Sequence, residues 1–351
     1  MTGVEKGYPL FDAHCDTVMK VLDDGADFVS GAGCGHVSWP GMEAADLRAQ
    51  VFACFVLSEH YPGEEAARAH AMIDAIESMC AETNGGMTLA TSGGAIERAF
   101  NSGPRAAILA LEGADPLEGR AENLRGFAER GVRDVIFAWK DNPFCGTAFG
   151  ENTPLTSEGE RLLGLCEDLR VMVDVSHLSD KGFEDVRDAA TRPFIASHSN
   201  CRAVCPSPRN LTDDMIRTVA ERGGVMGINL SPAFLNPSYY EATLPLRKAA
   251  QRPEATKEEQ QRLREQAAAL PRGGLEWAVR HALHAIDVGG ENCVGLGCDL
   301  DGIAFLPEGM GSLADLKALV PLLRDAGLRE TQIEKICFGN FVRVFVDVLG
   351  V

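Results

Sequence analysis

Short hydrophobic runs rich in β-branched residues recur along the chain, and amphipathic stretches with helical spacing separate them. Eight runs are predicted strands: Tyr8–Ala13, Val51–Leu57, Ala106–Leu111, Val135–Ala138, Val171–Val175, Phe194–Ala196, Val225–Leu230 and Cys293–Leu296. The predicted helices between them include Glu64–Thr83, Ala121–Arg130, Ser157–Leu169, Lys181–Ala190 and Asp213–Arg222. Nearly continuous apolar strands that alternate with helices are typical of a parallel sheet covered on its faces. Eight such units favour an α/β fold, a closed (β/α)8 TIM barrel.

The stretch 232–274 is longer than one strand-to-strand connection requires. It contains the charged, alanine-rich segment Ala255–Leu270, which we predict to be a solvated helix. Because the stretch has few large apolar residues, we expect a helical insertion in the seventh unit rather than a second domain. After the last strand, Leu313–Ala326 and Thr331–Leu349 are predicted closing helices. We therefore expect residues 1–351 to form a single barrel domain.

Composition and charge argue against several classes of protein. Hydrophobic residues make up 45% of the chain and charged residues 24%, which is typical of a soluble globular protein. The formal net charge of −18 disfavours binding to nucleic acid or anionic lipid. No membrane span or secretory signal is recognisable. The eleven cysteines are irregularly spaced, so we expect reduced core thiols in a cytoplasmic protein.

Polar side chains that can bind a metal fall at the ends of five predicted strands: His14 and Asp16, Glu112, His177, His198, and Asp299. Active sites of (β/α)8 barrels form where the strands end, so we expect these side chains to converge. His14 and Asp16 are two apart in an extended segment and can reach one cation together. For each residue taken alone, a capping or packing role is the alternative.

A dinuclear metal centre would account for these residues together. Glu112 follows an uninterrupted apolar run, where a carboxylate is costly unless it binds a cation, and it could bridge two metals. The charges of Asp16, Glu112, Asp299 and a bridging hydroxide would balance two divalent cations. Imidazoles such as His177 and His198 suit zinc. We therefore predict two Zn²⁺, with other divalent metals as the alternative, and hydroxide attack in which Asp299 transfers the proton.

Other polar residues have weaker functional signals. Arg209 lies in the loop after the sixth predicted strand and could bind a substrate carboxylate, although an exposed loop arginine is the alternative. Asp301 precedes a glycine and is typical of a turn. The chain has no H-E-x-x-H, G-x-S-x-G or P-loop motif. The remaining histidines are predicted surface or packing residues: His36, His60, His70, His281 and His284.

The motifs FDAHCDT, LALEGAD, DVSHLSD, ASHSN with PSPRN, VGLGCDLDG and FGNFVRVF together resemble the membrane (renal) dipeptidase family of zinc metallopeptidases, which are amidohydrolase-type barrels. The resemblance implies that His14 and Asp16 bind one zinc, that His177 and His198 bind the other, and that Glu112 bridges them. It also implies that Arg209 and Asp299 bind substrate. The activity implied is hydrolysis of dipeptides, often with a D-residue at the C-terminal side, by a protein that is often dimeric.

Trp139, in VIFAWKDN, stands where mammalian members have a histidine that contacts the scissile group. Because an indole has one N–H and no charge, we interpret Trp139 as a substrate-binding wall of the pocket. The signal peptide and lipid-anchor tail of the membrane-bound members are missing, so no membrane partner is expected.

The leading hypothesis is a dipeptidase for free-carboxylate dipeptides. The same metal site could instead serve an N-acyl-amino-acid amidase or a lactonase, and a non-catalytic barrel is the third alternative. The outer helices and the apolar tail Phe338–Val351 could support a homodimer.

Overall fold

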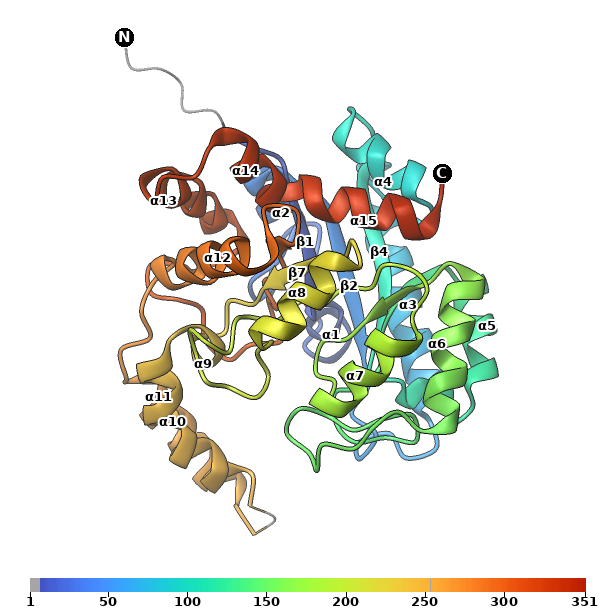
Figure 1. The fold of residues 1–351 in the computed structure, drawn as a ribbon, viewed down its shortest axis with the longest axis horizontal. Helices are drawn as coiled ribbons and strands as arrows, with labels where there is room; N and C mark the ends of the chain where they lie inside the picture. The colour runs from blue at the N-terminus through green and yellow to red at the C-terminus, as the bar shows by residue number, and fades with distance from the viewer. Residues whose placement is uncertain (1–6, 253) are drawn as a thin grey trace.

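A ring of parallel strands forms the centre of the molecule (Figure 1). The structure is a computed structural model that describes residues 7–252 and 254–351. Hydrogen-bonded neighbours follow the order β6 (Met172–Asp174), β5 (Val132–Ile136), β4 (Arg105–Glu112), β2 (Leu47–Phe55), β1 (Leu10–Cys15), β8 (Val294–Leu296) and β7 (Met226–Ile228). The segment 194–196 joins the two ends, because Ile195 bridges Asp174 of β6 and Ala196 bridges Met226 of β7. The predicted barrel is confirmed.

Two features of the sheet differ from the sequence prediction. The predicted strand Phe194–Ala196 contributes only the two isolated bridges of Ile195 and Ala196, because the chain turns away directly after them. A short strand that was not predicted, β3 (Met87–Leu89), pairs with the first three residues of β4, Arg105–Ala107. It leads into α4 (Gly93–Phe100). With three residues, β3 is too short to give a hydrophobic run.

Helices surround the barrel largely where the hydrophobic pattern predicted them. Those on the outer face are α3 (Glu65–Glu82), α5 (Leu124–Glu129), α6 (Ser157–Leu169), α7 (Asp180–Ala189), α8 (Asp213–Glu221) and α12 (Glu276–Gly289). The shorter elements are α1 (Thr17–Asp23), α2 (Trp39–Ala45) and two 3-10 turns, η1 (Asp115–Leu117) and η2 (Ala121–Asn123). None of the helices in the part of the chain that the structure describes is long and apolar enough to span a membrane.

The C-terminal segment covers the end of the barrel where the strands begin (Figure 1). The predicted helix 313–326 is divided into η3 (Leu313–Ala318) and α13 (Leu319–Asp325). The predicted helix 331–349 consists of α14 (Glu330–Glu334), a π-helical turn η4 (Lys335–Gly339) and α15 (Asn340–Leu349). Phe341 and Phe345 of α15 stack on Phe11 inside the barrel, with ring centroids 5.3 and 5.4 Å apart. This aromatic cluster fills the end of the barrel opposite the predicted site.

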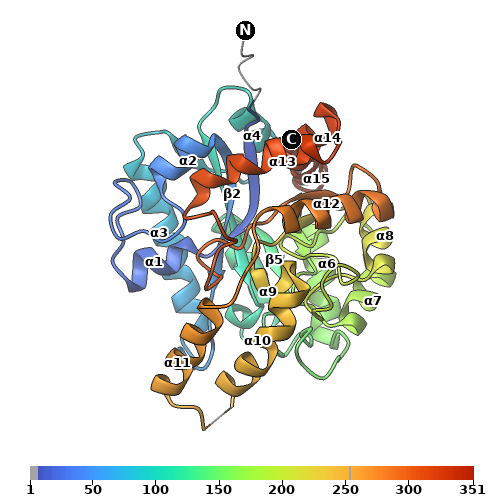
Figure 2. The same cartoon turned by 90° about the vertical axis from the view of Figure 1, so that its left-hand side faces the viewer.

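The segment after β7 forms α9 (Pro232–Leu235) and then a helical hairpin of α10 (Pro237–Ala250) and α11 (Lys257–Ala268). The hairpin projects beyond the barrel, as both views show (Figures 1 and 2). The expected solvated helix is present as α11, but Leu263 and Ala267 on it are buried. The Tyr239 hydroxyl of α10 donates a hydrogen bond to the Ala267 carbonyl, 3.2 Å away. The two helices therefore pack on each other through one face of α11.

Candidate active site

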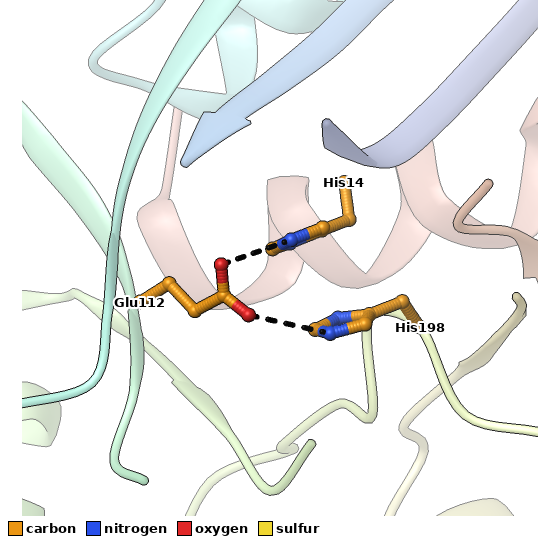
Figure 3. A group of neighbouring side chains, drawn as sticks. All are labelled: His14, Glu112 and His198. Atoms are coloured by element: carbon orange, nitrogen blue, oxygen red, sulfur yellow. Dashed lines mark ion pairs between the residues drawn. The ribbon is translucent and has the colours of Figure 1, made fainter. Parts of the chain in front are cut away.

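Glu112 lies at the centre of a cluster of histidines at the carboxyl ends of the strands (Figure 3). Its Oε2 atom is 3.3 Å from Nε2 of His14, at the end of β1. Its Oε1 atom is 3.2 Å from Nε2 of His177 and 3.7 Å from Nε2 of His198. Asp16 Oδ2 lies 3.4 Å from the same nitrogen of His14. The two carboxylate oxygens of Glu112 thus face different histidines, which is the arrangement a bridging ligand needs.

The donor atoms of this cluster fit metal ions. His14, Asp16 and His198 are buried, yet both ring nitrogens of His14 and Oδ1 of Asp16 have no hydrogen-bond partner among the described residues. The Nε2 atoms of His177 and His198 lie 2.9 Å apart. Buried polar atoms without partners are costly, and imidazole with carboxylate is a donor set that zinc prefers. The residues present therefore fit a metal centre.

Two overlapping groups of ligand atoms lie within 4.8 Å of one another: His14 with Glu112 and His198, and His14 with Asp16 and Asp299. The first group places His14 beside His198, and their rings stack with centroids 3.7 Å apart. The resemblance to the dipeptidases pairs His177 with His198 on one metal, and the contact between their Nε2 atoms is compatible with that pairing. Which ligands belong to which metal stays a prediction.

The electrostatics of the cluster favour the metal-binding forms of His177, His198 and Glu112. Burial lowers the pKa of His177 to about 4 and that of His198 well below its usual value, so both rings are neutral at pH 7. Burial also opposes protonation of His14, but the charges of Glu112 and Asp16 outweigh it and raise the pKa of His14. Burial would raise the pKa of Glu112, but His14 and His177 lower it strongly. Without a metal, a proton on His14 therefore takes the place of a cation beside Glu112.

A buried hydrogen-bond network holds His198 from behind. Ser197 Oγ lies 2.8 Å from Nδ1 of His198 and 3.3 Å from Oγ of Ser176. Asp174 Oδ1 accepts hydrogen bonds from the backbone N–H groups of Ser176 (2.8 Å) and Ser197 (3.0 Å). A partner on Nδ1 leaves Nε2 free for a metal. The sequence analysis missed these residues, although a serine directly precedes both His177 and His198.

Asp299 lies beside this centre, on a loop with unusual backbone geometry. Its φ is +57°, and that of His177 is +66°, in the left-handed region that few residues other than glycine adopt. The side-chain amide of Asn229 donates a 2.7 Å hydrogen bond to Oδ2 of Asp299. Burial, with a contribution from the charge of Glu112, raises the pKa of Asp299 to about 6. A carboxyl group with this pKa can accept and release a proton near neutral pH.

Arg209 and Trp139 occupy different positions relative to the cavity. Arg209 is only 3% exposed, donates to Ser199 Oγ (2.6 Å) and to the His198 carbonyl (2.9 Å), and does not line the cavity. It is therefore not the exposed loop arginine that was the alternative. Burial lowers its pKa to about 10, so it stays charged. Trp139 is 39% exposed, lines the cavity and packs on Phe55, with ring centroids 4.8 Å apart.

The residues predicted to be structural have structural contacts. Asp301 accepts hydrogen bonds from the Thr17 hydroxyl (2.7 Å) and the His36 backbone N–H (2.5 Å). The ring of His36 in turn accepts from the Asp301 N–H, a pairing that sequence spacing did not reveal. His281 is buried between the Cys201 N–H and the Leu235 carbonyl. All eleven cysteines are free thiols.

A cavity of about 750 Å³ opens above the cluster. Asp16, Glu112, His177 and Asp299 line its inner end, and aromatic and aliphatic side chains line its walls. The insertion 232–274 supplies one of these walls, which the sequence analysis did not predict. The wall residues from this insertion include Phe234, Tyr239, Thr243, Leu246, Arg247, Leu263 and Arg264.

Comparisons with known proteins agree with the fold and identify the family. The family model of the membrane dipeptidases, peptidase family M19, matches residues 1–350. An uncharacterized protein encoded in the pqqA 5′ region of Klebsiella pneumoniae is 31% identical over 281 residues, which cover 78% of this chain and 93% of the relative.

Two solved structures show the same similarity. The dipeptidase AC, a metallopeptidase of family M19, is 27% identical with a TM-score of 0.83, over 99% of this chain and 100% of the other. A metallopeptidase from Rhodobacter sphaeroides, liganded with a phosphinate mimic of the dipeptide L-Ala-D-Ala, is 26% identical with a TM-score of 0.83, over 98% and 100%. The resemblance found in the motifs is confirmed: this chain belongs to the membrane dipeptidase family, peptidase family M19, and is a hydrolase.

Proposed function

We propose that the protein is a binuclear zinc dipeptidase that hydrolyses dipeptides with a free carboxylate. The observation that carries the proposal is the position of Glu112, whose two oxygens face His14 on one side and His177 and His198 on the other. With Asp16, these residues would hold the two ions. When bound, the ions supply Lewis acidity that polarises the scissile carbonyl and makes hydroxide available at neutral pH.

Asp299 is the proposed proton carrier. Its pKa of about 6 leaves the carboxylate mostly ionised at pH 7, ready to accept the proton of the attacking water. The same group can then protonate the departing amine, which must leave as a neutral molecule. Asn229 orients the carboxylate through its hydrogen bond to Oδ2.

Arg209 is the proposed binding group for the substrate carboxylate. Its guanidinium is buried without an ion pair to any described residue, and its Nε atom has no hydrogen-bond partner. A buried cation of this kind is stabilised by an anion. Because Arg209 lies behind the cavity wall, substrate binding would require a small movement of the loop that carries it. Trp139 and Phe55 would contact the substrate side chain across the cavity.

The apolar walls also favour a second candidate, hydrolysis of N-acyl amino acids on the same metal site. A ninhydrin assay of zinc-loaded protein separates the two. We expect cleavage of L,L or L,D dipeptides, and no cleavage of C-terminal amides or N-acylated analogues. In Arg209→Met, the preference for a free carboxylate should be lost. If protein with two bound metals leaves every dipeptide intact, the dipeptidase proposal is wrong. A cytoplasmic location and a homodimer stay predictions.

A further inference from the structure

Charge is unevenly distributed around the cavity. Three of its four acidic residues, Asp16, Glu112 and Asp299, lie at the inner end with the histidine cluster. The fourth, Asp141, accepts a hydrogen bond from the backbone N–H of Thr147. The wall supplied by α9, α10 and α11 contains Arg247 and Arg264 and, among its described residues, no carboxylate. This wall therefore combines apolar surface with positive charge, whereas the protein as a whole carries a net charge of −18.

Arg247 is the less exposed of the two arginines and has no anionic partner among the described residues. Its Nε and Nη2 atoms are buried and make no hydrogen bond to any described residue. Its nearest aromatic contact is the ring of Tyr240, whose centroid lies 5.0 Å from the guanidinium carbon. By contrast, Arg252 in the same hairpin pairs with Glu259, with Nη2 and Oε1 2.8 Å apart. Lys140, another cation lining the cavity, pairs with Glu59.

A partly buried guanidinium without a carboxylate is an unfavourable arrangement in the free protein. Removal from water disfavours the charged form, and burial accordingly lowers the pKa of Arg247. The contact with Tyr240 compensates for only part of this cost. A carboxylate that enters the cavity would form charge-assisted, bidentate hydrogen bonds to the guanidinium and so restore the lost interactions.

From this wall, which lies in the same cavity as the metal ligands, we propose that Arg247 binds a second carboxylate of the substrate and thereby selects dipeptides with an aspartate or glutamate side chain. The inference rests on the proposed dipeptidase function, in which Arg209 binds the α-carboxylate. Arg264, from the facing helix α11, adds positive charge to the same wall. The insertion would thus be the specificity element of the enzyme.

The test compares matched substrates that differ only in side-chain charge, such as Ala-D-Glu with Ala-D-Gln and Ala-L-Glu with Ala-L-Gln. We expect the wild-type kcat/KM to favour glutamate over glutamine by about tenfold to hundredfold, the range of one hydrogen-bonded charge pair. In Arg247→Gln this preference should fall towards one through a rise in KM for the glutamate dipeptide. The variant should still cleave the glutamine dipeptide, which also shows that it is folded.

Arg262→Gln is the matched control, because Arg262 is an exposed arginine of α11 that does not line the cavity. It should retain the wild-type preference. The inference is overturned if the wild type does not discriminate, or if Arg247→Gln keeps the preference. It is also overturned if Arg247→Gln slows both substrates equally, because Arg247 would then bind the α-carboxylate. Cleavage of glutamine dipeptides in any of these cases leaves the dipeptidase proposal intact, whereas no cleavage of any dipeptide refutes both.

Discussion

The hydrogen bond from Asn229 to Asp299 should set the pH at which the enzyme loses activity in acid. The Asn229 amide donates to Oδ2 of Asp299 over 2.7 Å, and this contact favours the ionised carboxylate. Asn229→Ala removes the donor, so the pKa of Asp299 must rise. The carboxylate is the active form in our proposal, and activity should therefore fail at a higher pH than in the wild type.

The size of the shift follows from the strength of the bond. A hydrogen bond to a charged group contributes about 1.5–3 kcal/mol, and one pKa unit corresponds to 1.36 kcal/mol. The acid limb of kcat/KM should therefore move upward by about 1–2 pH units. If the wild-type limb lies near the pKa of about 6 for Asp299, the variant should lose about fivefold to fiftyfold in kcat/KM at pH 6. Bound cations would change the pKa of Asp299 in the wild type and in Asn229→Ala alike, so the difference between the two pKa values would remain.

The assay is a pH profile of kcat/KM for one dipeptide, measured for wild type, Asn229→Ala and Asn340→Ala. Asn340 is a suitable control because it is also buried, at the opposite end of β8, and donates to the Glu291 and Val294 carbonyls at 2.9 and 2.8 Å. Asn340→Ala should lower the thermal stability without moving the limb. An unchanged limb in folded Asn229→Ala would refute the assignment of the limb to Asp299.

Three further predictions concern buried groups of the barrel. In Ser197→Ala, His198 loses the partner of its Nδ1 atom, so the affinity for the zinc ion that His198 binds should fall by about 10–100-fold in a calorimetric titration. Unchanged zinc affinities would contradict this prediction. Asp134 is buried, and neither of its carboxylate oxygens has a hydrogen-bond partner in the part of the chain that the structure describes. Burial and the charge of Asp174 raise its pKa, so the folded protein keeps a proton on Asp134 at pH values where the unfolded chain has released it. The free energy of unfolding should therefore decrease as the pH rises. In urea unfolding, Asp134→Asn should stabilise the protein by about 1–3 kcal/mol at pH 8 and by less at pH 5. Equal stabilisation at both pH values would exclude this explanation. Phe341→Ala should cost about 3–5 kcal/mol, and a loss below 1 kcal/mol would mean that the cluster with Phe11 relaxes.

The sequence predicted the site better than it predicted the cavity. His14 and Glu112 lie at the ends of β1 and β4, and Asp299 follows β8. The carboxyl ends of parallel strands meet at one face of a barrel. Their convergence therefore follows from strand periodicity alone. The distances that make Glu112 central depend on side-chain rotamers, and local sequence does not determine these.

The parts that were missed depend on contacts between distant segments. The cavity wall from the insertion exists because Tyr239 of α10 packs on α11. The charged composition of residues 255–270 does not predict this contact. The burial of Arg209 depends on hydrogen bonds to Ser199 and to the His198 carbonyl, ten and eleven residues earlier in the same connection. The predicted strand Phe194–Ala196 pairs only through Ile195 with β6 and through Ala196 with β7, because the extent of its pairing depends on those distant strands.

The left-handed backbone at His177 and Asp299 places function in conflict with thermal robustness. For an ordinary residue this conformation costs about 1–2 kcal/mol, which glycine would avoid. A directed-evolution screen that selects only for heat resistance should therefore enrich His177→Gly and Asp299→Gly, and both variants would lose the chemistry. Engineering for higher thermal stability must therefore keep His177 and Asp299 unchanged and introduce stabilising substitutions elsewhere in the barrel.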